Sequence, residues 1–182
     1  MGEKRETIED VARREADAER ERAAAMNERI ELSGKVAKEM PERFFELCGL
    51  LRENVRRFNS AADPQKRLVW RESVALAARD SNLNGDFNCT FGRVGGELTV
   101  ALNAMGRSGK PDVYIIEGTG QLGVGEKMTR FMLRIEGYAK DGKVQLRMTI
   151  DFKRLECTLE ELSERLVLAI LKSDFNQLYR AQ

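Results

Sequence analysis

One long stretch of strong helix formers constrains the fold of this chain more than any other feature. From Glu3 to Phe58 the sequence consists largely of Ala, Glu, Arg and Leu, with one proline and two glycines. These residue types have high helix propensity, so we expect residues 1–60 to form a helical arm. Pro41 cannot donate the backbone hydrogen bond of a helix interior, and we expect a kink or a restart there. A continuous helix would project outward, whereas a break at Pro41 would let the arm fold back.

The first half of the arm is too polar to form a core of its own. Ile8, Val11 and Met26 are its few large apolar residues. Oppositely charged side chains four residues apart, such as Glu9 and Arg13, each add only a few tenths of a kcal/mol to a helix. Solvated helices without tertiary packing are marginally stable, so we expect this half to fray or to become ordered on a partner.

The second half carries an apolar seam. Its apolar side chains recur at alternating spacings of four and three residues, which is the pattern of a coiled coil. Further apolar residues widen the stripe, and a wide stripe also suits packing on the chain's own domain. Of these two alternatives we favour a homo-oligomer. The predicted oligomerisation residues are Met26, Ile30, Ala37, Met40, Phe44, Leu47, Leu51 and Phe58.

Residues 61–182 predict a compact second domain. Beyond a turn-rich joint at residues 59–64, roughly six short segments alternate apolar and polar side chains, as strands do. Tight-turn dipeptides separate several of them, and short connections force neighbouring strands to be antiparallel. These dipeptides are Asn84-Gly85, Gly95-Gly96 and Asp141-Gly142.

A helix is expected to close the domain. Thr158-Leu159-Glu160-Glu161 is a capping box, in which the threonine and the third following glutamate satisfy free backbone amides. Leu162, Leu166 and Ile170 then share one side, which we expect to cover the apolar face of the sheet. The predicted fold class is therefore α+β, with a long charged N-terminal helical arm, coiled-coil-like and kinked near Pro41, followed by an antiparallel sheet under a C-terminal helix.

Composition excludes several classes of function. The chain has no histidine, and so lacks the usual general base near neutral pH and the commonest zinc ligand. Cys48, Cys89 and Cys157 are odd in number and far apart, which favours reduced thiols. Lysine and arginine total 31 against 30 acidic residues, so no global field attracts nucleic acid or a membrane. Without a signal-like or membrane-spanning run, we expect a cytoplasmic chain with no catalytic residue, metal or cofactor.

A glycine-rich segment needs separate consideration. Gly118, Gly120 and Gly123 have the GxGxxG spacing of some phosphate-binding loops. Such loops open a helix, whereas the residues after Lys127 alternate as in a strand. We therefore favour a hairpin loop, and a small phosphate-binding enzyme is the third alternative for function.

Basic residues gather in the last predicted hairpin. Its apolar and basic side chains fall on opposite faces, and the basic face also carries Tyr138. Such a face can bind single-stranded nucleic acid or another anionic ligand, although most are simply solvated or contact protein. Nucleic acid is therefore not favoured. The candidate anion-binding residues are Arg130, Arg134, Lys143 and Arg147.

The hypothesis that the sequence supports best is a non-enzymatic assembly or adaptor protein. The seam would join copies of the chain, and the α+β domain would be presented to a protein partner. The alternative is a nucleic-acid or anionic-ligand binding module that uses the last hairpin.

Overall fold

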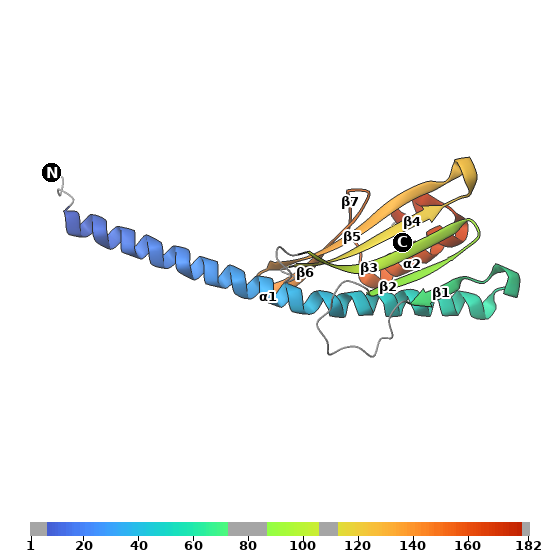
Figure 1. The fold of residues 1–182 in the computed structure, drawn as a ribbon, viewed down its shortest axis with the longest axis horizontal. Helices are drawn as coiled ribbons and strands as arrows, with labels where there is room; N and C mark the ends of the chain where they lie inside the picture. Colours follow the sequence, from blue (N-terminus) through green and yellow to red (C-terminus); the bar gives the residue numbers. More distant parts are fainter. Residues whose placement is uncertain (1–6, 73–86, 106–112, 180–182) are drawn as a thin grey trace.

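The structure is a computed structural model and describes residues 7–72, 87–105 and 113–179. Helix α1 (Ile8–Ala61) comes first, an antiparallel sheet follows, and helix α2 (Leu159–Lys172) lies near the end (Figure 1). The predicted α+β class is confirmed. Short 3-10 turns lie at Pro64–Lys66, Gly125–Lys127 and Phe175–Tyr179.

The sheet has seven strands rather than about six. Each strand pairs antiparallel with the next along the chain, in the order β1 to β7. The strands are β1 (Val69–Glu72), β2 (Phe87–Arg93), β3 (Gly96–Met105), β4 (Val113–Leu122), β5 (Thr129–Lys140), β6 (Lys143–Ile150) and β7 (Lys153–Leu155). The dipeptides Gly95-Gly96 and Asp141-Gly142 separate neighbouring strands as predicted, whereas Asn84-Gly85 lies outside the described residues.

The additional strand β7 follows a turn without glycine. Asp151 and Phe152 both adopt positive φ, 46° and 67°, in the left-handed region that glycine and asparagine usually occupy. The Asp151 carboxylate accepts a hydrogen bond from the Met132 amide at 2.8 Å, and its own amide donates to the Met132 carbonyl at 2.9 Å. These bonds stabilise a turn that the residue types alone do not signal.

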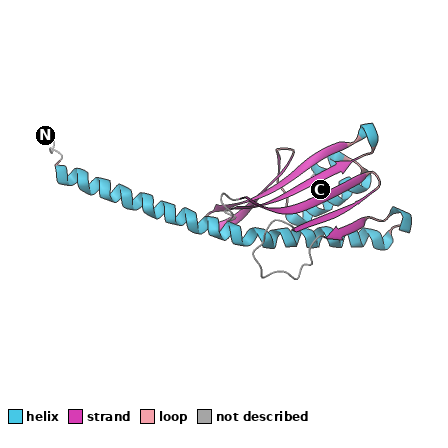
Figure 2. Cartoon of the chain, viewed as in Figure 1, coloured by secondary structure: helices cyan, strands magenta, loops and turns pink. Residues whose placement is uncertain are grey.

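Both helices lie on the same face of the sheet (Figure 2). The register pairs Leu133 with Ile150 and Ile135 with Met148, so the apolar side chains of β5 and β6 share this face as predicted. All four side chains are buried. One face of the sheet is therefore core, and no described helix covers the other.

Helix α1 joins the core only from Val36 onward. Its buried side chains beyond that point include Met40, Leu47 and Leu51, which have no exposed surface. Before Val36 the helix extends away from the sheet (Figure 1). Pro41 lies inside the continuous helix, so the predicted restart is not observed and the arm projects outward. Burial of Met40 on the sheet stabilises the turn that the missing proline donor weakens.

Helix α2 begins at the predicted capping box. The Glu161 amide donates to Thr158 Oγ1 at 3.2 Å, and the Thr158 amide donates to the Glu161 carboxylate at 3.0 Å. The apolar side of α2 is buried, and Ser163 accepts a hydrogen bond from the Asn54 side chain of α1 at 2.9 Å. The two helices therefore form one layer under the sheet.

Candidate interaction surfaces

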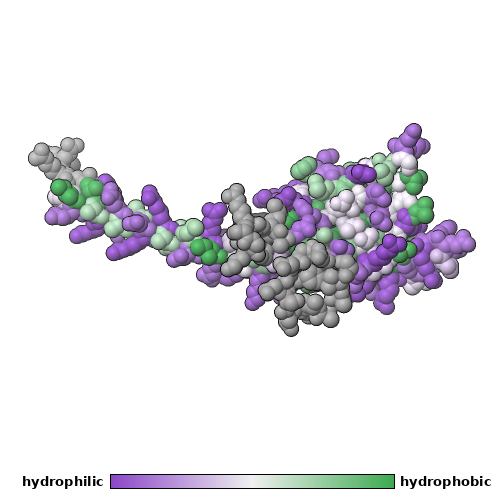
Figure 3. Space-filling model, viewed as in Figure 1, coloured by the Kyte–Doolittle hydropathy of each residue, from purple (hydrophilic) through white to green (hydrophobic). Residues whose placement is uncertain are grey.

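The N-terminal half of α1 is the most exposed part of the described chain. No side chain between Ile8 and Lys35 is buried. Met26 and Ile30 are 57% and 58% exposed, although both are large and apolar. Figure 3 shows this half as a thin arm on which green apolar residues lie among purple polar ones. The arm thus presents apolar surface that the rest of the described chain does not cover.

The residues of the predicted oligomerisation seam differ in how much of their surface is exposed. Ala37 and Phe58 are half-buried, and Met26 and Ile30 are exposed. The other four residues have almost no exposed surface left for a second copy, because they pack into the chain's own core. These four side chains therefore pack on the chain's own domain, which was the second alternative. These four are Met40, Phe44, Leu47 and Leu51.

A groove of about 470 Å³ opens where the arm leaves the sheet. The helix crosses β5 so closely here that a Cβ on Gly137 would lie 2.7 Å from Met40 Sδ and 2.8 Å from Val36 Cγ1. Glycine is needed at this crossing for steric reasons. Glycine within an alternating strand is a signal of close approach that the sequence contains and that the prediction did not use. The groove is lined by Ala25, Glu28, Arg29, Leu32, Ser33, Val36, Gly137, Tyr138 and Ala139.

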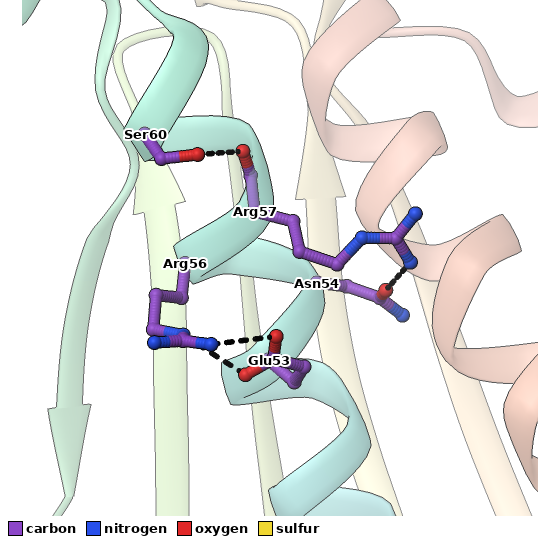
Figure 4. A network of polar contacts seen from close by, with 5 residues as sticks. All are labelled: Glu53, Asn54, Arg56, Arg57 and Ser60. Carbon is purple, nitrogen blue, oxygen red and sulfur yellow. Dashed lines mark hydrogen bonds and ion pairs between the residues drawn. The ribbon is translucent and has the colours of Figure 1, made fainter.

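Polar side chains near the C-terminal end of α1 form hydrogen bonds within the helix (Figure 4). Arg56 donates twice to the Glu53 carboxylate, at 2.9 and 3.0 Å, and this contact lowers the pKa of Glu53. Arg57 donates to the Asn54 side chain at 3.4 Å, and Ser60 donates to the Arg57 carbonyl at 2.8 Å. Glu53 neutralises Arg56, and Arg57 lies 4.0 Å from the Glu164 carboxylate, so this side of the helix is a solvated surface.

The candidate anion-binding residues lie on the sheet face opposite the helices. The register places them in two neighbouring strands, β5 and β6, with Glu136 and Tyr138 among them. Two are at the ends of their strands and two are central. The strand-end residues are Arg130 and Lys143, and the central ones are Arg134 and Arg147.

The two central arginines already have partners within the sheet. Arg134 Nε lies 2.7 Å from the Glu136 carboxylate, and its guanidinium reaches Glu117 at 4.0 Å. The Arg147 guanidinium lies over the Tyr138 ring, 5.3 Å from its centroid. Arg134 is therefore largely neutralised. Arg147 lies opposite Glu136 in the register but stacks on Tyr138, while the Glu136 carboxylate pairs with Arg134.

The glycine-rich segment lies mostly within the sheet. Gly118 and Gly120 belong to β4, and the connection to β5 starts only at Gly123. A Cβ on Gly120 would lie 2.1 Å from Phe131 Cζ, so this glycine makes room for an aromatic core residue. The hairpin prediction thus holds for the segment from Gly123 to Lys127, and the first two glycines serve packing.

The cysteines are free thiols. Cys48 of α1 and Cys89 of β2 are buried with their sulfurs 3.1 Å apart. The contact with Cys89, followed by burial, raises the pKa of Cys48, and burial also raises the pKa of Cys157. The protonated thiol is therefore favoured at Cys48 and at Cys157, and these two sulfurs are not activated nucleophiles.

The described residues were searched for metal sites and for membrane-spanning helices, and show neither. Within the described residues, no group of three or more acidic or cysteine side chains is placed to hold a metal ion. None of the described helices is both long enough and apolar enough to cross a membrane.

Models of known protein families, curated proteins and solved structures were all compared with the chain, and none of them matches it.

Proposed function

We propose that this protein is a non-enzymatic assembly or adaptor protein. It self-associates through the exposed half of α1 and holds its sheet domain toward a protein partner. The observation that carries the proposal is the arm between Ile8 and Lys35, which spans about 40 Å at 1.5 Å per residue. It has no buried side chain, yet it continues a helix that is firmly packed from Val36 onward.

A second copy of the chain is the partner that fits this arm. Its apolar positions fall on one side at coiled-coil spacing, interrupted by Glu19. The alanines allow two helices to approach closely, and charges of both signs flank the stripe, so two identical arms can pair their charges. Association would cover Met26 and Ile30 and stabilise a helix that is marginal alone. The stripe consists of Ala12, Ala16, Ala23, Met26 and Ile30.

The anionic-ligand alternative receives less support. Arg134 is engaged by Glu136 and Glu117, and the ring of Tyr138 is covered by Arg147. A single-stranded nucleic acid binds best where aromatic rings are free to stack on bases. The candidate residues therefore lack the arrangement that would favour this alternative.

Sedimentation equilibrium of the full chain tests self-association. We expect wild-type protein at micromolar concentration to exceed the monomer mass of 20.7 kDa. The double variant Met26→Glu, Ile30→Glu should sediment as a monomer, because buried unpaired carboxylates oppose association. Ala24→Glu adds a carboxylate outside the stripe, about 100° around the helix from Ala23, and should leave association unchanged. A wild-type protein that remains monomeric throughout would contradict the proposal.

A further inference from the structure

Half of strand β6 has a free edge. The strand pairs with β5 along its whole length, whereas β7 pairs only with Met148, Thr149 and Ile150. No other described residue forms a backbone hydrogen bond to residues 143–147 on that side. Every second residue of this segment therefore directs an amide and a carbonyl outward, as edge strands do.

The side chains along this edge alternate in chemistry. Lys143, Gln145 and Arg147 are exposed on the face opposite the helices. Val144 and Leu146 are half-buried and contact the core from the other face. An incoming strand would thus meet basic groups on one side and apolar groups on the other.

Positive charge at the edge is unbalanced. Lys143 lies directly opposite Lys140 in the β5–β6 hairpin, and like charges in this position destabilise a strand pair. Within the described residues, Lys140, Lys143 and Arg147 form no ion pair with an acidic side chain. Carboxylates placed beside this edge would therefore relieve a repulsion that the described residues leave in place.

We propose that residues 143–147 of β6 bind an extended acidic segment of a partner protein as an added strand. The segment carries carboxylates at alternate positions, facing Lys143 and Arg147, with apolar residues between them facing Val144 and Leu146. Backbone hydrogen bonds supply the affinity and the side chains select the sequence. This inference rests on the proposed adaptor function and names the chemistry of its partner.

A second copy of the chain does not fit the same edge. Two β6 edges side by side would bring the Lys143 and Arg147 charges of both copies together, and basic edge residues are a common means of preventing such pairing. Nucleic acid is disfavoured because Tyr138, the aromatic residue nearest these charges, donates to Gln145 at 2.9 Å and lies under Arg147. An acidic peptide satisfies both the backbone and the charge.

Fluorescence anisotropy with a labelled peptide of sequence Glu-Val-Glu-Val-Glu-Val-Glu tests the proposal on the full chain. We expect binding that weakens roughly tenfold or more in the double variant Lys143→Glu, Arg147→Glu. The matched control Lys66→Glu, Arg67→Glu makes the same charge change on exposed residues just before β1, at the opposite edge of the sheet, and should bind as wild type does. Equal losses in the two double variants would overturn the site and indicate an effect of net charge.

Further probes separate strand addition from a general attraction of charges. The same peptide with proline at its centre should bind at least roughly tenfold more weakly, because proline removes an amide donor and resists strand pairing. Equal binding of the proline peptide would overturn strand addition. Tighter binding of an oligothymidylate, lost in the same double variant, would overturn the peptide class in favour of nucleic acid.

Peptide binding and self-association can fail independently. The arm variant Met26→Glu, Ile30→Glu retains the β6 edge and should bind the peptide with wild-type affinity. Amide hydrogen exchange of the wild-type complex should show new protection at residues 143–147. Peptide binding without this protection would overturn the inference, whatever the oligomeric state of the chain.

Discussion

Truncation of Leu47 to alanine should lower the free energy of unfolding of the monomer by roughly 3 kcal/mol. Leu47 has no exposed surface and belongs to the buried core to which α1, the sheet and α2 all contribute. The substitution removes three carbon atoms, which at about 0.8 kcal/mol per buried methylene accounts for about 2.4 kcal/mol. The cavity left behind adds to this loss, because the surrounding helix and strands relax only in part.

Urea denaturation followed by circular dichroism measures this loss directly. The protein should be kept at low micromolar concentration and studied at several dilutions, so that association does not contribute to the apparent stability. Ile30→Ala is the matched control, because Ile30 occupies the same predicted seam but is 58% exposed. We expect this control to change the free energy of unfolding by less than about 0.5 kcal/mol at the lowest concentration.

Two results would contradict the placement of Leu47 in the core of the monomer. If Leu47→Ala and Ile30→Ala cost the same, and both losses grow with protein concentration, then both residues lie in a contact between copies. A loss below about 1 kcal/mol for Leu47→Ala would likewise show that this residue is not part of a close-packed core.

Two further predictions concern packing and pH. Gly120→Ala should cost about 1 to 3 kcal/mol in the same assay, since its Cβ would lie 2.1 Å from Phe131 Cζ. Gly49→Ala on α1 meets no heavy atom within 4 Å and should raise stability by up to about 1 kcal/mol; losses in both variants would contradict this. The contact with Cys89 and burial raise the pKa of Cys48, so the folded state favours the neutral thiol. The contribution of Cys48 to stability should be constant below about pH 8.5 and fall as pH rises further, because the unfolded thiol then ionises. Cys48→Ala should flatten this alkaline decline, and an unchanged slope would show that other groups cause it.

The parts of the fold that follow from local alternation could be predicted from the sequence. The faces of β5 and β6 were predicted correctly because a tight turn at Asp141-Gly142 determines the register, and every second residue then shares a face. The start of α2 was predicted correctly because a capping box acts within four residues. Both signals are short in range and do not depend on the rest of the chain.

The division of the seam could not be predicted in the same way. Heptad spacing describes an apolar side of a helix, and that side looks the same whether it contacts a second copy or the chain's own sheet. Met26 and Leu47 therefore carry the same signal, although one is exposed and the other buried. Distinguishing them requires the position of the sheet beneath the helix, which is a contact between residues distant in sequence.

The free edge of β6 was missed for a related reason. Its alternating residues predict a strand, but alternation does not tell how far the next strand pairs with it. That extent depends on the short turn at Asp151 and Phe152, which has no glycine to mark it. The basic residues were recognised, yet only the pairing shows that Lys143 and Arg147 border an unsatisfied backbone.

The continuity of α1 through Pro41 ties the orientation of the arm to the sheet. One rigid rod runs from the core into solvent, so each residue inserted or deleted before Val36 would shift the arm tip by about 1.5 Å and rotate it by about 100°. In an assembly joined by arms, such a change would turn one sheet domain relative to the other while leaving both folded. The length of the helix would therefore determine both the distance between the two sheet domains and their relative rotation, and so the directions in which their open sheet faces point.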